Sequence, residues 1–216
     1  MRISRSICLL LAASTFAAPA SAAPAEAPNP VFTGGDLFNL SSASDAQISP
    51  DGRSVAYVRK SADIMTDKLR SSIWLINVAT GEQRPIVAGT GDHFSPRWSP
   101  DGRRIAYAST AEGGAPQLFV RWMDTGQTVR VTGLPDSPQA MAWSRDGKRL
   151  AYLMNVPDDG PKLGSAPEKP EGANWAKPLQ ILDKVTYRAD GAGYIKPGFE
   201  HIFMLDEGHL VFPLVP

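Results

Sequence analysis

A short phrase built around an Asp-Gly pair occurs three times in this chain of 216 residues. The copies run from Ile48 to Val58, from Trp98 to Ala108 and from Trp143 to Leu153. Their aspartates, Asp51, Asp101 and Asp146, follow one another at intervals of 50 and 45 residues. A period of this size is typical of repeat proteins, in which each repeat is one supersecondary unit that packs on the next.

Each phrase predicts a β-hairpin. Glycine after aspartate permits the positive φ angles that a tight two-residue turn requires. Small and large apolar residues crowd the segment Arg104–Ala108, which is typical of a strand buried on both faces. Each aspartate is interpreted as a turn residue and not as a metal ligand, because no other carboxylate repeats with it. Trp98 and Trp143 recur in register, so we expect them in the core between sheets and not in a substrate platform.

A second signal alternates with the first. Strand-like runs lead into Thr80-Gly81 and into Thr125-Gly126, and strand-like runs follow both pairs, which are 45 residues apart. Each unit therefore holds four strands, two around Asp-Gly and two around Thr-Gly. Antiparallel units of four strands and about 40–45 residues are the blades of β-propellers.

The third unit is interrupted. The distance from the Asp-Gly aspartate to the phenylalanine of the next strand is 18 residues in the second unit (Asp101 to Phe119) and 57 in the third (Asp146 to Phe203). An insertion of 39 residues therefore splits the third blade, and we expect a small hairpin within it around Asp190-Gly191. The predicted fold is all-β, a partial propeller of about three four-stranded blades over residues 36–216. The expected blades are at about 45–89, 90–134 and 138–154 plus 201–213, with the insertion at 155–200.

The first 22 residues have the pattern of a secretory signal peptide. Arg2 and Arg5 precede a short apolar run, and the small residues before Ala23 suit cleavage after Ala22. The run is shorter than the ~20 apolar residues of a membrane span. Cleavage removes Cys8, the only cysteine, and we expect a periplasmic or secreted protein whose residues 23–35 form a disordered lead-in.

Charge and motif composition exclude several kinds of site. The chain has 22 basic and 22 acidic residues and no basic stripe, which argues against nucleic-acid binding. His93, His201 and His209 are too scattered for a metal motif. We therefore assign no catalytic, cofactor-binding or metal-binding residue. The candidates for contact with a peptide or a partner domain are Trp175 and Tyr194, both in the insertion.

Two passages resemble a known enzyme family. The opening, with Asp36-Leu37-Phe38 and then the stretch 44–52, resembles the start of the propeller in the prolyl oligopeptidase family of serine peptidases. The stretch 183–194, followed by His201-Ile202-Phe203, is similar to a passage of the acylaminoacyl-peptidase-like branch. The phrase Ser-Pro-Asp-Gly alone is shared with TolB-like periplasmic propellers. The resemblance runs from about residue 36 to about residue 205.

The resemblance implies a non-catalytic part of an exported serine peptidase that acts on short peptides. Members of that family carry their nucleophile on a Gly-x-Ser-x-Gly elbow in an α/β-hydrolase domain after the propeller, and no such motif occurs in residues 1–216. The expected role is substrate gating or docking, and the expected partners are further blades and the hydrolase domain, or a second copy of the chain. The alternative is a TolB-like periplasmic protein-binding propeller. The closing residues Leu210–Pro216 do not resemble a natural domain end, which a truncated or frameshifted reading frame would explain. We further expect the isolated chain to be marginally stable or prone to aggregation, because an open stack of three blades leaves two blade faces unpaired.

Overall fold

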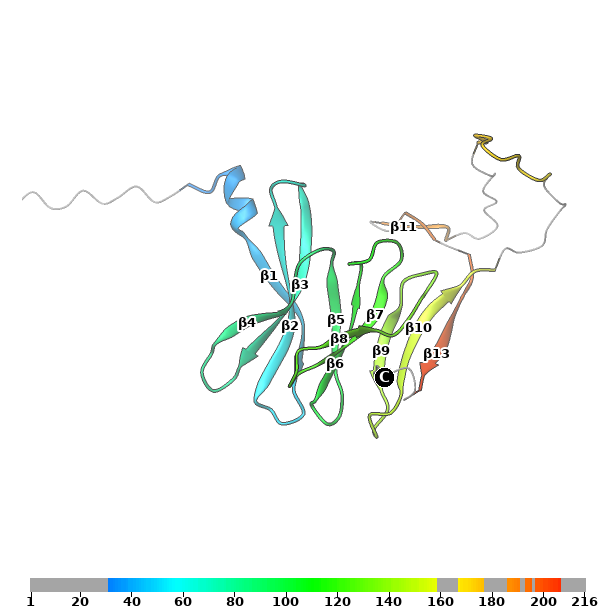
Figure 1. Cartoon of the computed structure of the whole chain (residues 1–216). Coiled ribbons are helices and arrows are strands. Elements are labelled where there is room, and N and C mark those ends of the chain that lie inside the picture. The colour runs from blue at the N-terminus through cyan, green and yellow to red at the C-terminus, as the bar shows by residue number, and fades with distance from the viewer. Residues whose placement is uncertain (1–30, 159–166, 177–185, 191–192, 196, 207–216) are drawn as a thin grey trace, which may run out of the picture. The chain divides into compact units, whose positions relative to one another are not determined.

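The computed structural model describes residues 31–158, 167–176, 186–190, 193–195 and 197–206 (Figure 1). The chain divides into two units, Met1–Thr33 and Gly34–Pro216, and the elements below belong to the second. It begins with a 3-10 helix, η1 (Gly34–Asn39), and every other element is a β-strand. The predicted signal peptide lies outside the described residues.

Three antiparallel sheets follow one another along the chain and confirm the predicted all-β repeat fold. The first sheet has the order β1-β2-β3-β4, the second has the order β5-β6-β7-β8, and the third has the order β13-β10-β9. The strands of the first sheet are β1 (Ser41–Ile48), β2 (Ser54–Asp63), β3 (Lys68–Asn77) and β4 (Gln83–Val87). Those of the second are β5 (His93–Trp98), β6 (Arg104–Ser109), β7 (Gln117–Trp122) and β8 (Thr128–Arg130). Those of the third are β9 (Gln139–Trp143), β10 (Leu150–Val156) and β13 (Phe199–Leu205).

The insertion divides the third sheet as expected. β10 and β13 pair over their full length, from Leu150 with Leu205 to Val156 with Phe199, although the insertion separates them in sequence. Within the insertion, β11 (Arg188–Ala189) pairs with β12 (Gly193–Tyr194), which confirms a small hairpin around Asp190. The fourth strand predicted at 210–212 lies outside the described residues.

The three Asp-Gly hairpins are confirmed, but the expected two-residue turn is wrong. In the first copy, the N–H of Ser49 donates to the carbonyl of Ser54 at 2.8 Å, so the loop between them runs from Pro50 to Arg53. A β-turn lies inside this loop, because the N–H of Gly52 donates to the carbonyl of Ser49 at 2.8 Å. Only the glycine has a positive φ angle, of 70°.

In each copy the aspartate closes the loop through its side chain, as the second copy shows. Asp101 Oδ1 accepts hydrogen bonds from Ser99 Oγ at 2.5 Å and from the N–H of Arg103 at 3.0 Å. Ser99 Oγ in turn accepts from the N–H of Arg104 at 2.9 Å. The same pattern recurs around Asp51 and Asp146, where the serine hydroxyl and then the backbone N–H two residues on lower the pKa of the carboxyl group. The repeated aspartates are thus structural residues of the loop, as predicted.

A bulge recurs in the first strand of each of the three repeated sheets. Its register shifts lie opposite β2, β6 and β10, and it places a non-glycine residue at positive φ each time: Asp45 at 48°, Ser95 at 55° and Ala140 at 45°. Bulges of this kind bend the strand and redirect its side chains. Because the three residues differ in type, the sequence repeat did not reveal the bulge.

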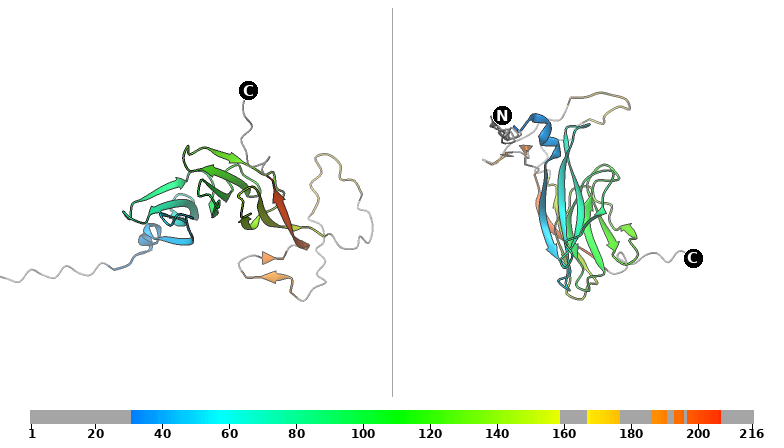
Figure 2. Two further views of the ribbon diagram at one scale, coloured as in Figure 1. Left: turned by 90° about the horizontal axis from the view of Figure 1, so that it is seen from below. Right: turned by 90° about the vertical axis from the view of Figure 1, so that its left-hand side faces the viewer.

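Two apolar cores lie between consecutive sheets, and β6 contributes to both. Ile105 and Tyr107 pack with Ile73 and Leu75 of the first sheet. The alternate residues, Ala106 and Ala108, belong to the core shared with the third sheet. This confirms that the strand is buried on both faces. The three sheets therefore stand side by side in chain order, as Figure 2 shows.

The loop hydrogen bonds predict different costs for the same substitution in two copies. Ser99 is fully buried, so Ser99→Ala leaves the N–H of Arg104 without its acceptor, and we expect the free energy of unfolding to fall by about 1–3 kcal/mol. Ser144 makes equivalent bonds in an exposed loop, where water replaces the hydroxyl, and Ser144→Ala should cost clearly less. Urea denaturation of both variants measures the difference, and equal losses would contradict this account.

Candidate interaction surfaces

A tryptophan connects each sheet to the one before it. Trp98 Nε1 of β5 donates to the carbonyl of Gln47 in β1 at 3.1 Å. Trp143 Nε1 of β9 donates to the carbonyl of Arg97 in β5 at 3.0 Å. In both cases the acceptor is the residue just before the start of the Asp-Gly phrase. Both rings also pack on the apolar cores, which confirms that the two tryptophans are core residues.

The two joints, as we name the interfaces between consecutive sheets, differ in their other polar contacts. In the first joint, Arg97 Nη1 forms an ion pair with Asp45 at 2.9 Å, so the bulge residue of one sheet holds the next. In the second joint, Arg104 Nη2 donates to the carbonyl of Gly147 at 2.9 Å. Its guanidinium carbon lies 5.0 Å from the ring centroid of Trp143, within the range of a cation–π interaction.

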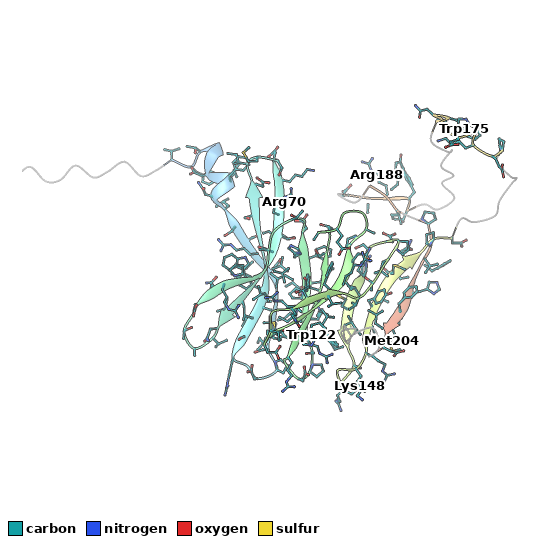
Figure 3. The ribbon with its side chains drawn as sticks, in the orientation of Figure 1. Arg70, Trp122, Lys148, Trp175, Arg188 and Met204 are labelled. Atoms are coloured by element: carbon teal, nitrogen blue, oxygen red, sulfur yellow. The ribbon has the colours of Figure 1, made fainter. Side chains whose placement is uncertain are left out.

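The outer face of the third sheet is apolar and exposed. Ile202 and Met204, on β13, have exposed fractions of 76% and 56%, and Figure 3 labels Met204 on this strand. By strand register their counterparts are Leu118 and Val120 in the second sheet, both 0% exposed. The same positions are therefore buried where another sheet follows and exposed where none does, and exposed apolar patches of this kind mark interaction sites.

A hollow of about 510 Å³ lies at the first joint between two Asp-Gly loops. Its carboxylates are Asp51 and Asp101, each already bound to a serine hydroxyl and a backbone N–H of its own loop. These hydrogen bonds give both carboxylates a structural role in their own loops. The hollow therefore offers no free acid–base pair for catalysis.

The predicted contact residues of the insertion are exposed. Trp175 is 46% exposed and Tyr194 is 56% exposed. Tyr194 stacks on Tyr187 with ring centroids 6.1 Å apart, a partner that the sequence reasoning missed although it flanks the predicted hairpin. Trp175 is labelled in Figure 3 on a separate segment of the insertion. Their role in binding stays a prediction.

A family model described as the TolB beta propeller domain (PD40) matches residues 38–159, more than half of the chain. The chain belongs to this propeller family. Its match covers the three Asp-Gly repeats and ends just beyond β10, where the insertion begins.

Several relatives of this chain are named as peptidases, and others are named Tol-Pal system protein TolB, from Alcanivorax borkumensis and Pseudomonas aeruginosa. The chain is 35% identical over 105 residues to the uncharacterized peptidase YuxL of Bacillus subtilis, covering 49% of this chain and 16% of the relative. It is 30% identical over 139 residues to dipeptidyl-peptidase 5 of Porphyromonas endodontalis, covering 61% and 20%. The chain thus spans about a fifth or less of these curated relatives.

A solved acylaminoacyl peptidase shares the fold. The Pyrococcus horikoshii enzyme superposes with a TM-score of 0.60 and 22% identity, over 80% of this chain and 25% of the enzyme. At this identity the likeness shows the fold alone. The superposition covers 80% of this chain, which is more than the residues 38–159 that the family model matches.

One serine–histidine pair in the PD40 domain is structural. Ser109 Oγ lies 2.9 Å from Nδ1 of His93, and both residues are buried. The neighbouring Asp92 carboxylate accepts from the N–H and Oγ of Ser71 in the first sheet. Substrate cannot reach so buried a serine. His201 is exposed on β13 and His209 lies outside the described residues, and no group of three metal-ligating side chains occurs in the described part of the chain.

No helix within the described residues is long and apolar enough to cross a membrane.

Removing the indole N–H at a joint should destabilise the domain. Trp143→Phe removes the inter-sheet hydrogen bond to the Arg97 carbonyl and weakens the contact with Arg104, so we expect the free energy of unfolding to fall by about 1–3 kcal/mol. Trp175→Phe, in the insertion and away from both joints, should change it by about 0.5 kcal/mol or less. Urea denaturation followed by far-UV circular dichroism gives both values. Similar losses for the two variants would contradict a joint-specific role.

His93 should make stability depend on pH. Burial lowers the pKa of His93, and the Asp92 carboxylate opposes that shift only in part. The folded domain therefore keeps His93 neutral, whereas the unfolded chain takes up a proton near the ordinary value of about 6.5. The His93 contribution is complete above pH 6.5 and is lost as the pH falls below it. Between pH 7.5 and 5, the free energy of unfolding measured with urea should fall in the wild type and in the variant His201→Gln, whose histidine is exposed. It should fall less in His93→Gln. An unchanged pH dependence in His93→Gln would contradict this account.

Proposed function

We propose that this PD40 domain gates and docks short-peptide substrates for an exported serine peptidase whose nucleophile lies outside the 216 residues. The observation that carries the proposal is the likeness of this chain to peptidases in both sequence and fold. Two curated relatives at 30% identity or above are named peptidases, and an acylaminoacyl peptidase has the same fold over four-fifths of this chain.

The chemistry of the chain supports an accessory role. The sequence has no Gly-x-Ser-x-Gly elbow, which carries the serine in α/β-hydrolase peptidases. In the described residues, the Ser109–His93 pair is buried and the carboxylates at the first joint serve their own loops. What remains for this domain is to shape access to a site on another domain.

The exposed aromatic residues of the insertion are the proposed contacts. Trp175 and Tyr194 combine large apolar rings with a polar group, and such side chains dominate the binding energy at interfaces. We assign them contact with the peptide or with the hydrolase domain. Export rests on the signal-like residues 1–22, and the periplasm or the cell exterior is the proposed location.

A TolB-like protein-binding propeller is the second candidate, because the matching family model is described by TolB. The DNA downstream of codon 216 separates the two candidates. A coding region with Gly-x-Ser-x-Gly there supports the peptidase. Its absence favours the binding propeller.

We expect the chain of residues 23–216 to hydrolyse no peptide or ester, because its sequence has no Gly-x-Ser-x-Gly elbow and the serine–histidine pair of the described residues is buried. The assay uses dipeptidyl, acyl-peptide and simple ester substrates together with a fluorophosphonate probe. A peptidase that contains the hydrolase domain is the positive control. Labelling of a single serine that disappears on denaturation would overturn the accessory role.

A further inference from the structure

The second joint holds an arginine guanidinium between two Asp-Gly loops. Arg104 Nη2 donates to the Gly147 carbonyl at 2.9 Å, and the guanidinium carbon lies 5.0 Å from the Trp143 ring centroid. The same nitrogen lies 3.9 Å from Asp101 Oδ2, and only 17% of the Arg104 side chain is exposed. The loops of the second and third sheets therefore share one arginine side chain.

The repeat places a serine where the first joint would have this arginine. Ser54 precedes Arg104 by 50 residues, the interval that also separates the first two Asp-Gly aspartates. Its short, uncharged side chain cannot reach the neighbouring loop or pair with a carboxylate as Arg104 does. Arg149 keeps the arginine in the third copy, so the serine is the departure from the repeat at this position.

The groups that bind Arg104 all have counterparts one repeat earlier. The counterparts of its carboxylate, carbonyl and indole ring are Asp51, Gly102 and Trp98. All three line the hollow of about 510 Å³ at the first joint, and so does Ser54. The two loops beside the hollow connect β1 with β2 and β5 with β6, at the lower end of the sheets in Figure 1. The hollow therefore presents the groups that bind a guanidinium in the second joint.

The carboxylate and the carbonyl can both accept hydrogen bonds from a ligand. The Ser49 hydroxyl and the backbone N–H of Arg53 lower the pKa of the Asp51 carboxyl group, which is therefore ionised at neutral pH. Both of these bonds use Oδ1 of the aspartate, whereas the oxygen that pairs with Arg104 in the second copy is Oδ2. The Gly102 carbonyl lies in a loop, outside the strand ladders.

We propose that the hollow at the first joint binds the guanidinium group of an arginine residue from another polypeptide. Asp51 pairs with its charge, the Gly102 carbonyl accepts an N–H bond, and the Trp98 ring lies against the guanidinium plane. Leu75 and Met123, which also line the hollow, provide apolar surface for the methylene stem. Each polar contact repeats one that the chain makes with its own arginine in the second joint.

A guanidinium fits this lining better than an ammonium or an anion. It is planar and has several N–H donors, so it can stack on an indole while it donates to a carboxylate and a carbonyl. An ammonium has no plane to stack, and Asp51 and Asp101 would repel an anion. Arg84, an exposed residue of β4 that also lines the hollow, opposes any cation. A single arginine side chain should therefore bind weakly, in the millimolar range.

The probe is Nα-acetyl-L-arginine amide, in which an uncharged backbone carries the arginine side chain. The matched control is the citrulline analogue, which has nearly the same shape but no charge. Each is titrated into the isotope-labelled full chain and followed by NMR. We expect saturable shifts at the Trp98 indole N–H and at the amides of Ser54 and Gly102. Citrulline should bind about fivefold more weakly or worse, because it loses the ion pair and the cation–π contact.

Two variants locate the binding. Asp51→Asn should weaken it about two- to fivefold, whereas Asp146→Asn, the same change in the loop of the third sheet, should leave it unchanged. Ser54→Arg gives the first joint the arginine of the second, so it should abolish binding of the probe and raise the urea concentration at the midpoint of unfolding. Far-UV circular dichroism checks that each variant folds, and Asp51→Asn carries the test if Ser54→Arg does not fold.

Several outcomes would each overturn the proposal: no saturable shift, equal binding of arginine and citrulline, or unchanged binding in Asp51→Asn or in a folded Ser54→Arg. Binding of free arginine without binding of the capped form would contradict a residue of a polypeptide as the ligand. Binding that appears only in Arg84→Gln would show that Arg84 itself occupies the hollow, and the proposal would fail. None of these results depends on peptidase activity, so this proposal and the proposed function fail separately.

Discussion

The hydrogen bond from an indole N–H to a strand carbonyl of the preceding sheet sets how the sheets of this domain meet. Apolar burial drives the sheets together, but it is non-directional and does not fix their register. The hydrogen bond is directional, and it joins Trp98 to Gln47 and Trp143 to Arg97 at equivalent positions. One contact, repeated, therefore aligns each sheet on the one before it.

The same repeat shows which apolar sheet face is exposed among the described residues. Ile202 and Met204 are exposed at positions that are buried in the other two sheets. Burying each large apolar side chain contributes about 1.5–3 kcal/mol, and a domain is stable by only about 5–15 kcal/mol. An uncovered sheet face is thus a substantial loss for a domain of this size. The expected marginal stability of the isolated chain follows from this argument and stays a prediction.

Structural roles account for most of the chemically suggestive side chains. The carboxylates of the Asp-Gly loops bind their own serine and backbone, and His93 and Ser109 are buried together. Three exposed aromatic residues, Trp175, Tyr187 and Tyr194, belong to the insertion between β10 and β13.

The sequence by itself determined the repeat, the strand-pairing hairpins, the split third sheet and the burial of β6, because these depend on turn residues and apolar spacing that recur along the chain. It did not determine the four-residue loops, where Asp101 acts through its side chain and only glycine takes positive φ. It also did not determine the bulges at Asp45, Ser95 and Ala140, which differ in residue type. The inter-sheet indole bonds were decided by tertiary structure alone, because they join residues 51 and 46 positions apart whose meeting depends on how the sheets pack.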